Sequence, residues 1–141
     1  MNVDRLISQL KVHEGTRSKV YLDTEGIETI GVGRNLRDRG LSDDEIEFLL
    51  ANDIRDFQEE VDRTFGWWSD LDDVRQRVIV DMAFNMGLGS LSKFKNTLGH
   101  IEAGRYEEAS VEMLDSKWAR QVGNRAQCLS NMMKTGEDND H

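Results

Sequence analysis

Strand-forming residues occupy one short segment of this chain, residues 18–33. The segment is rich in β-branched and aromatic side chains, among them Val20, Tyr21, Ile30 and Val32. The sequence D-T-E-G at residues 23–26 separates its two halves and is typical of a turn. Because strands are expected only here and helical spacing prevails elsewhere, the sequence predicts an α+β fold with a small antiparallel hairpin or sheet.

Apolar residues spaced by threes and fours predict roughly seven helices around this sheet. The first is expected to end at Gly15, and Asp70 is expected to cap a later one. Ser42 and Glu45 form a capping box that opens a helix of about 20 residues, long enough to join two lobes. The main predicted helices lie at about residues 3–13, 42–63, 70–86, 92–103, 105–115 and 124–133.

Charge and cysteine content exclude several classes of protein. The formal net charge of −9 argues against nucleic acid as the main ligand, because phosphate binding depends on Lys and Arg. It also argues against binding to an anionic membrane surface. Cys128 is the one cysteine, so we expect no intrachain disulfide, a reducing compartment and no zinc site. No run reaches the length of a membrane span, and the N-terminus lacks a signal-peptide core, so we expect no stable membrane insertion.

Two residues of the strand segment, together with one residue shortly before it, have side chains that suit acid–base chemistry. Glu14 lies at the expected end of the first helix, and Asp23 lies where the first strand meets the turn. If the turn closes near Gly26, Thr29 lies roughly opposite Asp23. A hydroxyl beside a carboxylate can hold a water, which fits inverting hydrolysis of a glycosidic bond. The spacing equally fits a plain helix-to-hairpin junction in which Asp23 serves only the turn.

The same segment resembles the catalytic segment of the phage-type lysozymes, glycoside hydrolase family 24. The residues that carry this gapless match are Glu14-Gly15, Tyr21, Asp23-Thr24-Glu25-Gly26 and Thr29-Ile30-Gly31-Val32-Gly33. Later segments resemble the same family in the same order, namely residues 81–87, 94–98, 116–118, 123–126 and 134–136. The resemblance therefore covers residues 3–136, nearly the whole chain.

The resemblance implies a role for individual residues. Glu14 would be the general acid that protonates the leaving glycosidic oxygen. Asp23 would position the attacking water or steady the positive charge that develops on the sugar, and Thr29 would help to hold the water. Arg125 matches a family arginine near the catalytic glutamate, and two further residues match positions that line the saccharide cleft. The substrate-binding residues implied in this way are Phe84, Thr97 and Arg125.

The resemblance also implies a single lysozyme domain over residues 1–141. Its lobes would be a sheet-containing lobe at residues 13–41, a connecting helix at 42–63, and a helical lobe made of 64–136 together with 1–12.

As a function, the resemblance implies a peptidoglycan muramidase that hydrolyses the β-1,4 bond between N-acetylmuramic acid and N-acetylglucosamine, without cofactor or metal. We expect a monomeric phage or prophage endolysin that stays in the host cytoplasm until a holin gives it access to the cell wall. Two alternatives stay open, a non-catalytic peptidoglycan-binding or regulatory domain and a lytic transglycosylase. One departure from the family pattern is Arg34, which stands where the family has a histidine.

Overall fold

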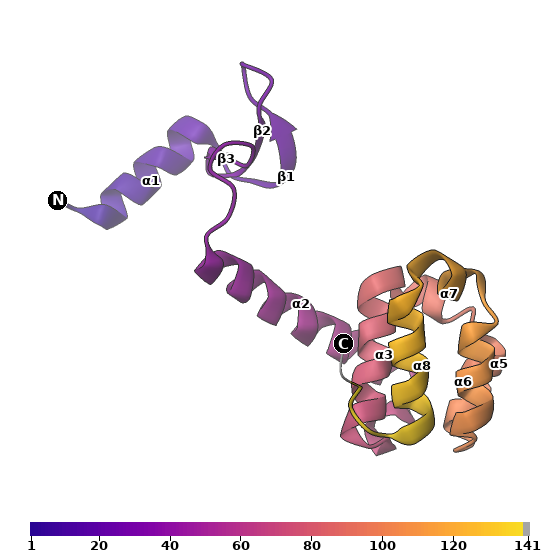
Figure 1. Ribbon diagram of the computed structural model, residues 1–141. Coiled ribbons are helices and arrows are strands. Elements are labelled where there is room, and N and C mark those ends of the chain that lie inside the picture. The colour runs from indigo at the N-terminus through magenta and orange to yellow at the C-terminus, as the bar shows by residue number, and fades with distance from the viewer. Residues whose placement is uncertain (140–141) are drawn as a thin grey trace. The chain divides into compact units, whose positions relative to one another are not determined.

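The computed structural model describes residues 1–139 of the chain. Over these residues it has eight α-helices, one short 3-10 helix and a three-stranded sheet, and it confirms the predicted α+β class (Figure 1). The last two residues of the predicted single domain lie outside the described part. The elements are α1 (Val3–Glu14), β1 (Arg17–Leu22), β2 (Glu28–Gly31), β3 (Arg34–Asn35), α2 (Asp43–Thr64), η1 (Trp68–Asp70), α3 (Asp73–Met86), α4 (Leu88–Leu91), α5 (Lys95–Glu102), α6 (Tyr106–Leu114), α7 (Lys117–Val122) and α8 (Asn124–Thr135).

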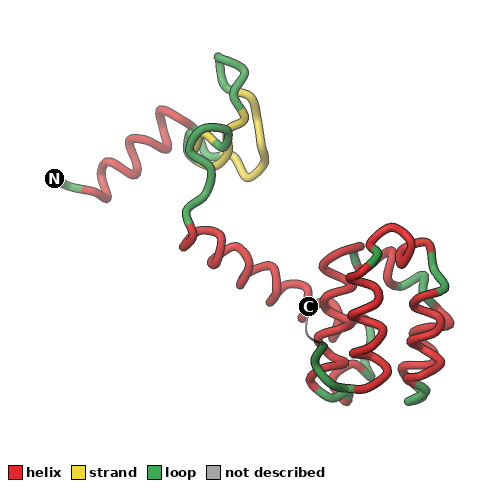
Figure 2. The backbone as a smooth tube through the Cα atoms, in the orientation of Figure 1, coloured by secondary structure: helices red, strands yellow, loops and turns green. Residues whose placement is uncertain are grey.

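The chain divides into two compact units, Met1–Leu49 and a second that begins at Leu50. The division falls within helix α2, so this helix contributes residues to both units. All three strands, which are yellow in Figure 2, belong to the first unit. The predicted grouping of residues 1–12 with the C-terminal lobe remains a prediction.

Local hydrogen bonds explain how the first unit begins. The Asn2 side chain accepts a hydrogen bond from the Arg5 N–H at 3.0 Å and caps the start of α1. Gly15, with a φ of 76°, follows the last residue of this helix. Strands β1, β2 and β3 follow in sequence order as an antiparallel sheet. The sheet therefore begins directly after α1, with only Gly15 and the next residue between them in the sequence.

The register between β1 and β2 differs from the one expected. Tyr21, and not Asp23, lies opposite Thr29, and Leu22 lies opposite Glu28. Asp23 instead closes the turn, since its N–H donates to the Ile27 carbonyl at 3.0 Å. The turn is centred one residue before Gly26, because the Asp23 side chain binds the backbone inside it and so shortens the loop.

The predicted capping box of the long helix is present. The Ser42 hydroxyl accepts from the Glu45 N–H at 3.2 Å, and the Glu45 carboxylate accepts from the Ser42 N–H at 2.8 Å. These reciprocal bonds begin α2 at Asp43, and the helix runs for 22 residues.

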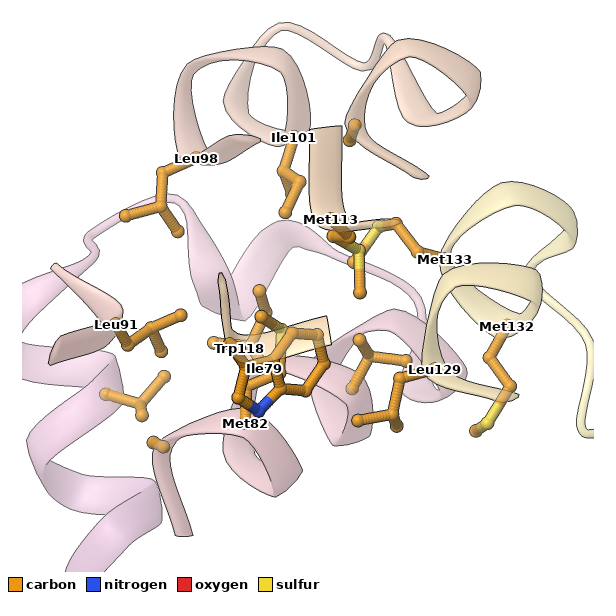
Figure 3. Close-up of a cluster of buried hydrophobic side chains, with 14 of the residues drawn as sticks. Ile79, Met82, Leu91, Leu98, Ile101, Met113, Trp118, Leu129, Met132 and Met133 are labelled. Atoms are coloured by element: carbon orange, nitrogen blue, oxygen red, sulfur yellow. The ribbon is translucent and has the colours of Figure 1, made fainter. Parts of the chain in front are cut away.

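The hydrophobic core of the second unit is built from residues at the end of α2, in η1 and in helices α3 to α8, and Figure 3 shows part of it. Its completely buried side chains include Ile79 and Met82 from α3, Met113 from α6 and Met133 from α8. Trp118 is 7% exposed and belongs to the same core. In the described part of the chain, no helix combines the length and apolar character that a membrane crossing requires.

Two predicted helix starts in the second unit are wrong. Asp70 lies in η1, and Asp72 caps α3 by accepting from the Arg75 N–H at 3.2 Å. The chain turns first as a 3-10 helix, which moves the cap two residues along. The helix expected from Ser92 begins at Lys95, because the short helix α4 occupies the residues just before Ser92.

Candidate functional site

Glu14 is the last residue of helix α1, and its side chain lies against the backbone of Gly33. Gly33 belongs to the two-residue turn between β2 and β3. The end of a helix and the end of a hairpin therefore meet at this carboxyl group, and both belong to the first unit.

Asp23 is held by the turn that follows β1. Its Oδ1 atom accepts two backbone hydrogen bonds, from Glu25 at 2.8 Å and from Ile27 at 2.9 Å. Both bonds end on the same oxygen, so the carboxylate has a fixed orientation while Oδ2 has its lone pairs free of these bonds. The structural and the catalytic interpretations of Asp23 are thus compatible, because each uses a different oxygen.

Thr29 lies in the middle strand of the sheet and is 4% exposed. Its hydroxyl donates a hydrogen bond to the Ile27 carbonyl at 2.8 Å. A hydroxyl whose proton is committed in this way can only accept from a further partner. Thr29 and Asp23 are therefore both anchored to the backbone of Ile27.

Arg34 joins strand β3 to the start of α2. Its Nε donates to the Gly40 carbonyl at 3.1 Å, and its Nη2 donates to the Glu45 carboxylate. The Ser42 N–H, then Arg34 and the Ser42 hydroxyl lower the pKa of Glu45 from 4.5 to about 2. The strand next to the Gly33 turn is consequently tied to the capping box of the long helix.

The three predicted substrate-binding residues lie in the second unit. Phe84 of α3 packs on the ring of Phe57 with 5.4 Å between the ring centroids. Thr97 of α5 is 3% exposed and lies at a pocket of about 210 Å³. Arg125 of α8 donates from Nε and Nη2 to Oδ1 of Asp81 at 2.9 and 2.6 Å. Asp81 therefore sets the direction of the Arg125 guanidinium, a pairing that the sequence interpretation missed.

The sequence interpretation also missed polar residues around a second pocket, of about 370 Å³. Trp118 lines this pocket, and its indole N–H donates to Oδ1 of Asn85 at 2.7 Å. Asn85 follows Phe84 in the segment that carries the family resemblance, and this position is the one signal that could have indicated it. Lys93 and Lys95, which flank the Thr97 pocket, were likewise not foreseen.

The candidate site therefore offers carboxyl groups and hydroxyls. Among residues 1–139, no three His, Cys, Asp or Glu side chains gather closely enough to hold a metal ion. In the first unit, Glu14 can exchange a proton with a substrate, while Asp23 and Thr29 both present hydrogen-bond acceptors.

Comparison with known proteins identifies the family of this chain. The family model described as Phage lysozyme matches residues 11–134. The chain is 26% identical to Probable T4-type lysozyme 1 of Dictyostelium discoideum, an alignment that covers 95% of this chain and 96% of that protein. It is 32% identical to the Endolysin of Bacillus phage B103, over 87% of this chain and 48% of that protein.

A further relative is the Pre-baseplate central spike protein Gp5 of Enterobacteria phage T4, with 28% identity over 93% of this chain. The chain spans only 28% of the length of that protein. The family match covers most of the chain, including Glu14, Asp23, Thr29 and Arg125, and it confirms the predicted family. The chain belongs to the phage lysozyme family and is, by that membership, a lysozyme-type glycosidase.

Proposed function

We propose that this protein is a muramidase that hydrolyses the β-1,4 bond between N-acetylmuramic acid and N-acetylglucosamine in peptidoglycan. The observation that carries the proposal is the state of Asp23, which is fixed through Oδ1 by two backbone hydrogen bonds. A preorganised carboxylate needs no rearrangement before it orients a water or stabilises charge. Glu14 and Thr29 belong to the same unit, and the family match includes both of them.

In the proposed mechanism, Glu14 donates its proton to the glycosidic oxygen as the bond to the sugar carbon breaks. A water donates one hydrogen bond to Oδ2 of Asp23 and the other to the Thr29 oxygen. Thr29 suits this role because its own proton is engaged with the Ile27 carbonyl. The lone pair of the water attacks the anomeric carbon from the opposite face, and the released proton passes to Asp23. This single displacement inverts the anomeric configuration.

We assign saccharide binding to Phe84, Thr97 and Arg125 of the second unit. An aromatic ring offers an apolar face to a sugar ring, a hydroxyl exchanges hydrogen bonds with it, and a guanidinium binds a carboxylate or an acetamido oxygen. No cofactor takes part in this proposal.

The biological role that we propose is lysis of a host bacterium by a phage or prophage endolysin. The relative from Bacillus phage B103 is named Endolysin, which supports this role. We propose that the protein acts as a monomer and reaches the wall from the cytoplasm only after a holin permeabilises the membrane. Cells that express it should therefore remain intact until chloroform is added.

A clearing assay on chloroform-treated Gram-negative cells tests the enzymatic proposal. Wild type should clear the suspension, and Glu14→Gln should lose at least about 1000-fold of that rate because the general acid is removed. Thermal unfolding should be nearly the same for both proteins. A wild type that binds walls without clearing them would show the non-catalytic alternative to be right, and an active Glu14→Gln would mean that another group is the acid.

Product analysis separates hydrolysis from transglycosylation. Mass spectrometry of the released muropeptides should show reducing muramic acid ends, and proton NMR of fresh products should show the inverted anomer. Anhydro-muramic ends would contradict the proposed role of water, Asp23 and Thr29 while leaving the substrate unchanged.

A further inference from the structure

We propose that Gly33 is a positioning residue for the general acid: its missing side chain leaves the space that the Glu14 carboxyl group occupies. The inference rests on the proposed function, because it concerns the efficiency of a catalytic Glu14. It concerns geometry within the first unit only.

The contact between these two residues is close. A Cβ atom built on Gly33 would lie 2.7 Å from Oε2 of Glu14, 3.0 Å from its Cδ and 3.1 Å from its Cγ. Non-bonded carbon and oxygen atoms do not approach each other to 2.7 Å without steep repulsion. Any side chain at position 33 must therefore displace either the carboxyl group or the turn between β2 and β3.

A second observation shows that backbone conformation alone does not account for Gly33. Gly33 has a φ of +66°, and Gly31, two residues earlier, has a φ of +69°. Both positions thus favour glycine on conformational grounds. A Cβ at Gly31, however, would meet no atom within 4 Å. A substituted alanine would be strained to a similar degree at both positions, so the two positions differ in the contact with Glu14.

Of the two groups that would collide, the Glu14 side chain moves more easily than the turn at Gly33. Its carboxyl group is the end of a flexible chain, whereas the turn at Gly33 is held between β2 and β3, and Arg34 ties β3 to Gly40 and Glu45. A methyl group at position 33 should therefore rotate Glu14 away and leave the backbone in place. A displacement of about 1 Å from the reacting geometry can reduce turnover about 100-fold.

The test compares Gly33→Ala with the matched control Gly31→Ala on soluble, uncross-linked peptidoglycan strands. The two variants should unfold at similar temperatures, because each places alanine at a positive φ. Gly33→Ala should lose about 100-fold in kcat with little change in KM, and Gly31→Ala should stay within about threefold of wild type. The ¹³C chemical shifts of the Glu14 side chain should move in Gly33→Ala and not in Gly31→Ala.

Three results would overturn the inference. They are a kcat of Gly33→Ala within about threefold of Gly31→Ala, unshifted Glu14 carbons in Gly33→Ala, and a Gly33→Ala chain that fails to fold while Gly31→Ala folds. If wild type itself cleaves no peptidoglycan, the proposed function fails. The NMR comparison still decides in that case whether Gly33 sets the position of Glu14.

Discussion

Arg34 and Glu45 form an ion pair, and its carboxyl group titrates at acidic pH. The folded protein lowers the pKa of Glu45 from 4.5 to about 2, first through the Ser42 N–H and then through Arg34. A group with a depressed pKa stabilises the folded state above its unfolded pKa and loses this effect as the pH falls through its folded pKa. The contribution of Glu45 should therefore be complete above about pH 5 and fade towards pH 2.

Hydrogen exchange of the β2 amides in wild type and Glu45→Gln measures this prediction. The protection lost in Glu45→Gln should be constant from pH 5 to pH 8 and should shrink as the pH falls towards 2. Arg34→His is the informative counterpart. A paired histidine has a raised pKa, so its contribution should be complete below about pH 6.5 and be lost as the pH rises through the folded pKa. If the protection difference between wild type and Glu45→Gln changes between pH 6 and pH 8, Glu45 is not the titrating group.

Asp23 shows how far residue spacing could predict the site. The motif alone fitted both a turn residue and a catalytic carboxylate, and the structure has Oδ1 bound to the turn. The family resemblance was needed to single out this aspartate among 27 acidic residues. The Glu14–Gly33 contact and the Arg125–Asp81 pair could not be predicted, because each joins segments far apart in the sequence.

Arg75 joins two helices of the second unit. Its Nε and Nη2 atoms donate to the carbonyls of Met133 and Lys134 at 2.7 and 3.0 Å, in the last turn of α8, where carbonyls have no partner within the helix. Its guanidinium also lies 3.7 Å from the centroid of the Tyr106 ring and pairs with Asp72. One side chain thus connects the start of α3 with the end of α8 and with α6.

Arg75→Ala should lower the free energy of unfolding by about 3 kcal/mol, since charged hydrogen bonds and a cation–π contact are lost together. Arg77→Ala is the matched control. Arg77 lies two residues along the same helix, is 48% exposed and pairs with Asp73 and Asp138, so its loss should cost at most about 1 kcal/mol.

Urea unfolding followed by tryptophan fluorescence suits the comparison, because Trp67, Trp68 and Trp118 all belong to the second unit. Equal losses in the two variants would contradict the structural role of Arg75.

The sequence predicted which helices and strands are present more reliably than it predicted the residues at which they begin and end. The capping box at Ser42 was predicted to the residue, because both of its hydrogen bonds are local. The cap of α3 was predicted two residues too early, because the chain first forms a 3-10 turn and this turn depends on the packing of Trp68. The hairpin register shifted by two positions for a comparable reason, as the Asp23 side chain tightened the turn.

At the scale of the whole molecule, the sequence predicted one sheet-containing part and one helical part joined by a long helix. The structure has two compact units whose division falls within α2. The hydrophobic core belongs to the second unit, and its apolar residues recur at helical spacing along α3, α6 and α8. This periodicity is why the helices that carry the core could be predicted from the sequence.

The net charge of −9 yields a prediction about the proposed reaction. Bacterial walls are anionic, so long-range repulsion should slow the encounter between protein and wall. Raising the ionic strength from about 0.01 M to about 0.15 M shortens the screening length from about 30 Å to about 8 Å. The initial rate of wall clearing should therefore rise over this range, whereas a lysozyme of net positive charge should slow down.

A charge variant tests whether net charge is the cause. Glu102 is exposed at the end of α5, where a lysine is compatible with the helix dipole. Glu102→Lys makes the net charge less negative by two charges, from −9 to −7, and should reduce the salt dependence without changing the rate at high salt. A clearing rate that falls with added salt in wild type would instead indicate that local cations dominate the encounter. Arg17 and Lys19 on β1 are the first residues to neutralise in that case, because both are exposed.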